Sequence, residues 1–269
     1  MTSTPPPLAP DLLAALKRVQ LAHFRAVAAE LLQTATTQRW SPEQFLRTLL
    51  TTEIAGRDAA NQAARLKAAG FPVPKTFEAF QVATSSVPEA TVNYLASFEW
   101  LRARENLCLI GPAGTGKTHL LLAAGRTAVL AGYKVKYLIA ADLVELLYRG
   151  LADNTVGRVI ETLLRQDAIL VDELGFAPLD EVGTQLLFRF VAAAYERRSL
   201  GVASHWPFDQ WGRFLPQQST TASLLDRLLH HAVIVVTDGE SFRMKEARSR
   251  SGLRTTAERT AVHPSLGSG

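Results

Sequence analysis

The chain has 269 residues, 47% of them hydrophobic and 20% charged, which is an ordinary composition for a folded protein with a buried core. Its single cysteine, Cys108, excludes an internal disulfide, and no apolar run approaches the roughly eighteen residues of a membrane span. The first residues lack the basic-then-apolar order of a signal peptide, so we expect a cytoplasmic protein with no membrane partner.

The net charge of +4 is concentrated near the C-terminus, where residues 243–269 carry six basic and two acidic side chains. A basic segment of this kind suits the phosphate backbone of a nucleic acid. It is also typical of a solvated, disordered chain end. The charge pattern therefore leaves both interpretations open for a basic tail over residues 246–269.

The first seventy residues have a helical pattern. Residues 1–10 are Pro-rich and are expected to be disordered. From Asp11 to about Gln33, apolar residues recur at close to helical spacing, which predicts one helix with Asp11 as its N-cap. Ser41 and Gln44 have the spacing of a capping box, which predicts a second helix that ends near Gly70. We expect a small all-helical domain over residues 11–70 and a linker over residues 71–89.

From about residue 90, short apolar segments alternate with helix-like stretches. The apolar segments lie at residues 106–110, 134–139, 168–172, 200–204 and 232–236. Wholly apolar strands that alternate with helices are typical of a parallel sheet covered on both faces. The sequence therefore predicts an α/β domain with a five-stranded parallel sheet over residues 90–245.

Residues 111–118, GPAGTGKT, fit the phosphate-loop pattern G-x-x-x-x-G-K-[ST] between a predicted strand and a predicted helix. Glycines let the backbone wrap around phosphate oxygens, and the helix N-terminus adds partial positive charge. Lys117 should reach the β- and γ-phosphates of ATP, and Thr118 should coordinate Mg²⁺. The expected nucleotide-binding residues here are Gly111, Pro112, Ala113, Gly114, Thr115, Gly116, Lys117, Thr118 and His119.

The third apolar segment ends in two acidic residues, Asp172 and Glu173. A carboxylate at the end of a strand beside the phosphate loop can hold Mg²⁺, and the next one can polarise the attacking water. We therefore assign Asp172 to the metal and Glu173 to catalysis. This pair indicates an ATPase of the additional-strand class rather than a kinase or a GTPase.

Four further residues are candidates for sensing the nucleotide. Ser204 and His205 end the fourth predicted strand, where they can face the γ-phosphate, although His205 could equally be a loop histidine without a role. Arg227 precedes the fifth strand, where an arginine is usually offered to the nucleotide of a neighbouring subunit. The alternative for Arg227 is a surface residue paired with Asp226 or with solvent. Arg243 is a second candidate for phosphate contact.

Two other features are not expected to carry chemistry. His230 and His231 are adjacent, but no further ligands follow at a spacing typical of a metal site, so none is expected there. Cys108 falls in the first predicted strand and is expected to belong to the core.

Several longer segments resemble the IstB-like transposition helper ATPases of the AAA+ class, which are related to the DnaC-type helicase loaders. They are ENLCLIGPAGTGKTHLLLAAG, AILVDELGF, SHWPFDQW and SLLDRLLHHAVIVVTDGESFRMKEA. The resemblance covers residues 10–260. It implies an ATP-bound homo-oligomer that assembles on double-stranded DNA without sharp sequence preference and recruits a partner transposase. It also implies that Glu173 is the base, Arg227 the arginine finger and Arg243 the second sensor.

Two departures from that family bear on the function. The first sensor usually ends in Asn, where this chain has His205, and the second N-terminal helix is usually more basic. Three functions therefore stay open: a transposition helper, a DnaC-like helicase loader that uses the same ATPase site, and a nucleotide-dependent adaptor with negligible turnover.

Overall fold

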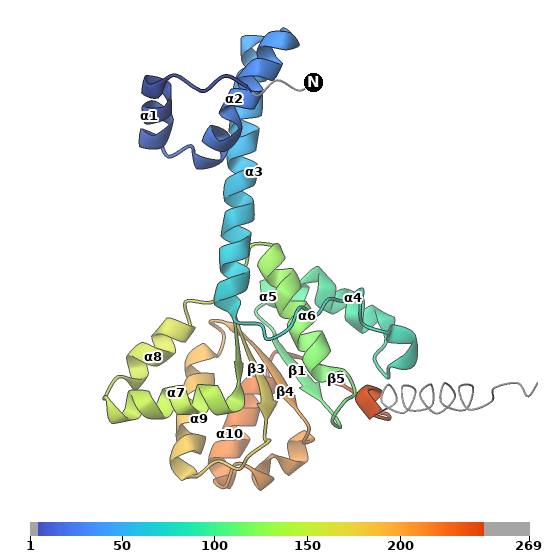
Figure 1. Ribbon diagram of the computed structural model, residues 1–269. Helices are drawn as coiled ribbons and strands as arrows, with labels where there is room; N and C mark the ends of the chain where they lie inside the picture. The colour runs from blue at the N-terminus through green and yellow to red at the C-terminus, as the bar shows by residue number, and fades with distance from the viewer. Residues whose placement is uncertain (1–4, 245–269) are drawn as a thin grey trace, which may run out of the picture. The chain divides into compact units, whose positions relative to one another are not determined.

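The structure, a computed structural model, describes residues 5–244 (Figure 1). The chain divides into two compact units between Arg65 and Leu66. The first unit is built from helices alone, and the second contains a sheet with helices on both of its faces. Within the described residues, every helix is too short or too polar to cross a lipid bilayer.

Three helices form the N-terminal part of the chain: α1 (Pro10–Arg18), α2 (Ala22–Thr37) and α3 (Pro42–Ala69). The capping box that begins α3 is confirmed. The Ser41 N–H donates to the Gln44 side chain at 2.9 Å, and the Gln44 N–H donates to the Ser41 hydroxyl at 3.2 Å. The single helix predicted from Asp11 to Gln33 is wrong, because the chain breaks between α1 and α2.

A buried carboxylate explains the break. Gln20 adopts a left-handed conformation, with φ of 59°, which ends α1. Glu53, on α3, is only 4% exposed and accepts hydrogen bonds from the N–H groups of His23 and Phe24 at 3.0 and 2.9 Å. It thereby caps the first turn of α2, whose own N-cap residue supplies no side-chain bond. A cap that comes from a distant helix leaves no trace in local periodicity.

The second unit contains the predicted five-stranded sheet, and every neighbouring pair of strands is parallel. The strand order is β2-β3-β4-β1-β5. The strands are β1 (Asn106–Ile110), β2 (Val135–Ile139), β3 (Ala168–Leu174), β4 (Ser199–Ser204) and β5 (Ala232–Val236). The fold class predicted from the sequence is therefore confirmed, with strand ends that differ by at most two residues.

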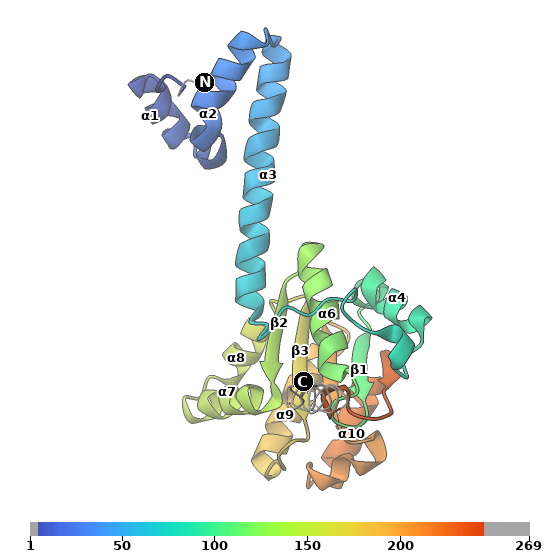
Figure 2. The same ribbon diagram turned by 45° about the vertical axis from the view of Figure 1, so that its right-hand side comes forward.

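Helices cover the sheet in two layers (Figure 1, Figure 2). One layer holds α4 (Glu89–Ser97), α5 (Glu99–Arg102) and α6 (Lys117–Leu130), and the other holds α7 (Ala140–Ala152), α8 (Val156–Leu163), α9 (Glu181–Ala194) and α10 (Gln218–Leu229). Alternate residues of a strand point to opposite faces of the sheet and therefore pack into opposite helix layers. Leu107 and Leu109 pack with α6, whereas Cys108 and Ile110 pack against the other layer. Cys108 is fully buried, as expected.

The segment between α3 and α4 contains a short 3-10 helix, η1 (Val82–Thr84). Its aromatic side chains Phe71, Phe77 and Phe80 pack against the α6 layer, and Val87 is buried within that layer. This segment therefore contributes to the core of the second unit. A second 3-10 helix, η2 (Phe208–Arg213), follows β4 and buries Trp211 in the opposite layer.

Candidate functional site

The glycine-rich loop connects β1 to α6 at the carboxyl edge of the sheet. Gly111 has φ of 146°, and a Cβ at this position would overlap the main-chain carbonyl of Thr237. Gly116 has φ of 101° at the N-cap of α6, and a Cβ there would lie 2.7 Å from the Phe80 ring. Both positions therefore require glycine, and the loop backbone stays open to a ligand at the positive end of α6.

Lys117 and Thr118 link this loop to β3. Lys117 is only 9% exposed, and its ammonium donates to the Pro112 carbonyl at 2.5 Å. The Thr118 hydroxyl donates to Oδ1 of Asp172 at 3.2 Å. The phosphate loop and the acidic end of β3 thus face one another, which is the arrangement that the sequence interpretation requires.

Electrostatics around Lys117 favour an anionic ligand. Burial lowers the pKa of the Lys117 ammonium, the Asp172 carboxylate partly opposes that shift, and the Arg243 guanidinium adds to it. The charged ammonium is therefore short of counter-charge. Phosphate oxygens bound by the loop would supply it.

Asp172 is held in one orientation by three donors. It is 3% exposed, and Oδ1 accepts from the Glu173 N–H at 2.9 Å as well as from Thr118. Oδ2 accepts from the Tyr137 hydroxyl at 3.0 Å, and burial and this carboxylate raise the pKa of Tyr137. Sequence reasoning missed Tyr137, because its place in β2 indicated only a strand residue.

The Thr118 hydroxyl and the Asp172 carboxylate fit Mg²⁺. Both are hard oxygen ligands, the type that Mg²⁺ prefers. Their separation of 3.2 Å is close to the roughly 2.9 Å expected between adjacent ligands of an octahedral Mg²⁺ ion. The donor set therefore suits a magnesium ion that is shared with a bound triphosphate.

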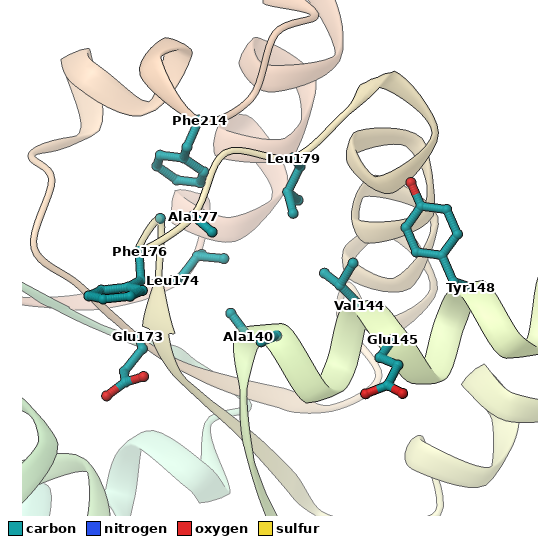
Figure 3. Close-up of a pocket in the computed structure, with 12 residues that line it drawn as sticks. Ala140, Val144, Glu145, Tyr148, Glu173, Leu174, Phe176, Ala177, Leu179 and Phe214 are labelled. Atoms are coloured by element: carbon teal, nitrogen blue, oxygen red, sulfur yellow. The ribbon is translucent and has the colours of Figure 1, made fainter.

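Glu173 lies at an irregularity of β3. Pairing with β4 shifts register between Val171 and Leu174, and Glu173 itself has φ of 58°. Bulges of this kind re-aim a side chain beside an active site. Glu173 is exposed, and its carboxylate is directed away from the apolar side chains of Val144 and Leu179 (Figure 3).

Those apolar side chains line a pocket of about 480 Å³ between the start of α7 and the loop after β3. Among the predicted site residues, Glu173 alone lines this pocket. Phe176 stands at its edge and is 82% exposed. The pocket is thus distinct from the phosphate loop, and the proposed base Glu173 is the candidate site residue that lines it.

Ser204 and His205 take different roles at the end of β4. Ser204 is buried; its carbonyl accepts from the Gly111 N–H at 3.2 Å, and its hydroxyl accepts from the Trp206 N–H at 3.2 Å. Ser204 therefore positions backbone on both sides of the site. His205 is half-buried, and the centre of its ring lies 4.6 Å from that of Trp206. Burial lowers the pKa of His205, and the positive charge of Lys117 lowers it further. The imidazole lies within electrostatic reach of the loop lysine.

The segment after β5 closes over the phosphate loop. The hydroxyls of Thr237 and Thr115 lie 2.6 Å apart, and the Phe242 N–H donates to the Gly114 carbonyl at 3.0 Å. This contact brings Arg243 to the loop, where its charge influences Lys117. Thr237 was missed by sequence reasoning, because nothing in its type or spacing relates it to a loop more than a hundred residues earlier.

His119 faces the segment before α4 rather than the centre of the loop. Its Nε2 lies 2.8 Å from the Thr76 carbonyl, and its ring packs edge-to-face on Phe80 at 5.4 Å. Phe80 therefore stands beside both His119 and Gly116. Among the residues that line the loop, this aromatic side chain is a further one that the sequence interpretation did not name.

Arg227 is not brought to the phosphate loop of its own chain. Its guanidinium donates to the Ser223 carbonyl at 3.0 Å and lies 5.0 Å from the centre of the Phe188 ring. The carbonyl of the next residue, Leu228, accepts from the side chain of Asn106, the first residue of β1. Arg227 therefore lies at the amino edge of the sheet, opposite the loop. Within residues 5–244, no ion pair joins it to Asp226.

The sheet order, the glycine-rich loop after β1 and the acidic pair in β3 define a P-loop domain of the AAA+ class. Solved structures have the same fold. DnaI aligns over 62% of this chain and 96% of its own with a TM-score of 0.54 and 16% identity. DnaA from Aquifex aeolicus, bound to AMPPCP, aligns over 65% of this chain and 54% of its own with a TM-score of 0.52 and 23% identity.

The chain belongs to the family of IstB-like ATP binding proteins, whose sequence model matches residues 14–250. It is 32% identical over 241 residues to the insertion sequence IS21 ATP-binding protein of Pseudomonas aeruginosa, which covers 89% of this chain and 91% of that protein. It is also 32% identical over 215 residues to the IS5376 ATP-binding protein of Geobacillus stearothermophilus, covering 80% and 86%. The family resemblance found in the sequence is confirmed.

Proposed function

We propose that this protein is an ATPase that assembles as a homo-oligomer on double-stranded DNA and recruits and stimulates a partner transposase. The observation that carries the proposal is the 3.2 Å contact between the Thr118 hydroxyl and the Asp172 carboxylate, in a chain of the IstB-like ATP binding family. This contact supports the proposal that Thr118 and Asp172 hold Mg²⁺ beside the phosphate loop.

Residues of the loop and of the neighbouring strands have different roles in binding and hydrolysing ATP. Backbone amides of residues 113–118 and the Lys117 ammonium bind the triphosphate. Thr118 and Asp172 would hold Mg²⁺, which neutralises charge that develops on the phosphates during transfer. Glu173, exposed beside this pair, polarises the attacking water as general base. His205 and Arg243 reach the phosphates from two other segments.

ATP-dependent assembly follows from the position of Arg227. Because Arg227 lies at the sheet edge opposite its own loop, it can serve only the nucleotide of another subunit. Bound ATP then links neighbouring subunits, and hydrolysis releases that link as a switch. DNA is held through its phosphates, hence without sharp sequence preference.

The partner is proposed to be a transposase because the relatives reported above are ATP-binding proteins of insertion sequences. A replicative helicase loader is the alternative, since DnaI has the same fold. The fold alone does not separate the two. Capture experiments distinguish them. A transposition helper should retain the transposase encoded beside it, whereas a helicase loader should retain a hexameric helicase.

Light scattering tests the assembly step. We expect the molecular mass of the parent protein to increase several-fold when a non-hydrolysable ATP analogue, Mg²⁺ and double-stranded DNA are added together. Lys117→Ala is the matched control and should stay at its nucleotide-free mass under the same conditions. An unchanged mass of the parent, with and without DNA, contradicts the proposal.

A further inference from the structure

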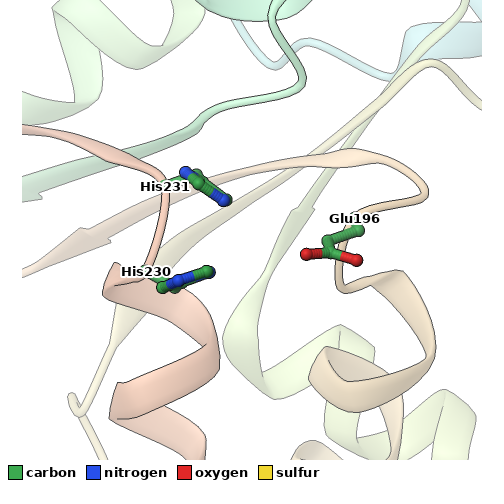
Figure 4. Close-up of side chains that lie close together, drawn as sticks. All are labelled: Glu196, His230 and His231. Atoms are coloured by element: carbon green, nitrogen blue, oxygen red, sulfur yellow. The ribbon is translucent and has the colours of Figure 1, made fainter.

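Two adjacent histidines after the end of α10 lie beside a carboxylate from another element. Glu196, in the turn between α9 and β4, joins His230 and His231, and candidate ligand atoms of all three lie within 4.8 Å of one another. The Glu196 carboxylate faces the two imidazole rings (Figure 4). Spacing along the chain predicted no metal site here, whereas the fold supplies a third ligand that spacing could not reveal.

The backbone that carries these side chains is tied to one buried residue, Asn106. Its N–H donates to the His231 carbonyl at 2.7 Å. Its side-chain amide donates to the Leu228 carbonyl at 2.9 Å and accepts from the Leu200 N–H at 2.8 Å. Asn106 is only 8% exposed. The end of α10 and the start of β4 are therefore held together, which places the ligands in advance.

Tyr195 orients one of the two imidazoles. Its hydroxyl lies 2.7 Å from Nδ1 of His230, with ring centres 5.8 Å apart. When Nδ1 donates its proton to the Tyr195 oxygen, Nε2 keeps the lone pair that a metal ion requires. Histidines that bind metals are usually held through their second ring nitrogen in this way.

Two arginines close to Glu196 have other partners for their guanidinium groups. Arg197 forms two hydrogen bonds of 3.0 Å with the carboxylate of Glu161. Arg104 donates to the main-chain carbonyl of Glu196 rather than to its carboxylate. Among the ion pairs of residues 5–244, none uses the Glu196 carboxylate. The Tyr195 hydroxyl hydrogen-bonds to this carboxylate but is neutral, so the negative charge of Glu196 is available to a cation from solution.

We propose that Glu196, His230 and His231 form a binding site for a divalent transition-metal ion, with Zn²⁺ as the best-fitting ion and water as the fourth ligand. Two imidazole nitrogens and one carboxylate oxygen suit zinc, whereas Mg²⁺ and Ca²⁺ require oxygen ligands. Tetrahedral zinc places its ligand atoms about 3.3 Å apart, so small side-chain rotations close the site. All three side chains are exposed and can make them. The site goes beyond the proposed function and does not depend on it.

Calorimetric titration with Zn²⁺ tests the site. The full chain is used without a histidine tag, stripped with a chelator, free of nucleotide and in excess Mg²⁺. We expect one Zn²⁺ per chain, with affinity at least tenfold lower in His231→Ala and in Glu196→Gln. Tyr195→Phe keeps the ring and removes only the hydroxyl, and it should lower the affinity about tenfold. Co²⁺ should give a visible absorption band that the same variants weaken.

His23→Ala is the matched control, because His23 lies in the N-terminal helical unit, and it should bind Zn²⁺ as the parent does. Ca²⁺ should not compete with Zn²⁺ in the parent. The proposal is overturned if Glu196→Gln and Tyr195→Phe bind Zn²⁺ as tightly as the parent, or if the parent shows no saturable one-to-one binding. These two variants are nearly isosteric, so they decide the question even if His231→Ala unfolds.

Discussion

The two edges of the sheet differ in how many partners their polar side chains find within the same chain. At the carboxyl edge, Lys117 and Asp172 are nearly buried and bonded to residues of the loop and of β2. At the amino edge, Arg227 is stacked on Phe188 with no anionic partner among the described residues, and the histidines beyond it are exposed. The polar side chains of the carboxyl edge are therefore held in place within the chain, whereas those of the amino edge are left for the neighbouring subunit that we propose.

The largest expected effects fall on the carboxyl edge. Lys117→Ala removes the ammonium that neutralises the phosphates, so we expect ATP affinity to fall about a hundredfold or more.

Glu173→Gln keeps the shape of the side chain but not its basicity, so phosphate release should slow about a hundredfold while ATP affinity stays near that of the parent. Equilibrium nucleotide binding and steady-state phosphate release measure the two effects separately.

Two outcomes would contradict this separation of roles. Equal binding of ATP by Lys117→Ala and the parent would remove the loop from the site. Equally slow phosphate release by Glu173→Gln and the parent would identify a nucleotide-dependent adaptor with negligible turnover. In that case the contact between Thr118 and Asp172 would serve binding alone.

Mixed oligomers test whether the carboxyl edge of one subunit and the amino edge of its neighbour share one nucleotide. Glu173→Gln lacks the base and Arg227→Ala lacks the arginine, so each variant alone should release phosphate at a few per cent of the parental rate or less. In a one-to-one mixture, about a quarter of the interfaces pair an intact Glu173 with an intact Arg227 from a neighbour. We expect the mixture to recover up to that fraction of the parental rate.

The doubly substituted chain, mixed with either single variant, is the control and should recover nothing, because no interface of such a mixture contains both residues. An arginine that acted within its own chain would give no recovery in the first mixture either. The experiment thus distinguishes an Arg227 that acts on the nucleotide of a neighbouring subunit from one whose role is purely structural.

The sheet was predictable from sequence because each of its strands is built around a short apolar run. Leu107 to Ile110 alternate between two packed layers, so all four of these β1 residues had to be apolar. The helix break before α2 was not predictable, because it depends on Glu53 reaching two N–H groups about thirty residues away. Local periodicity reports which face is buried and does not report long-range caps.

The site divides in the same way. Spacing identified Lys117, Thr118 and Asp172, because the phosphate loop and the end of β3 carry their chemistry in contiguous residues. Tyr137, Thr237 and the third ligand beside the two histidines come from segments that only the fold brings together. Their residue types are common, so no local pattern distinguishes them.

The smallest expected effect concerns His205, which directly follows β4. Burial and Lys117 lower the pKa of His205 in the free protein, and the negative charge of bound ATP should raise it again. ATP binding then takes up a proton at pH values between the two pKa values. The affinity of the parent should therefore increase as pH falls through the bound-state pKa and level off below the free-state pKa.

His205→Asn should abolish this increase and change phosphate release at neutral pH by less than about tenfold, because Asn also donates a hydrogen bond. Analogue binding measured from pH 5 to 8 for both proteins isolates the effect, since the phosphates of the nucleotide and His119 titrate alike in each. If the two affinity curves run parallel across that range, His205 does not face the phosphates. The nucleotide site at the carboxyl edge would then be formed without His205.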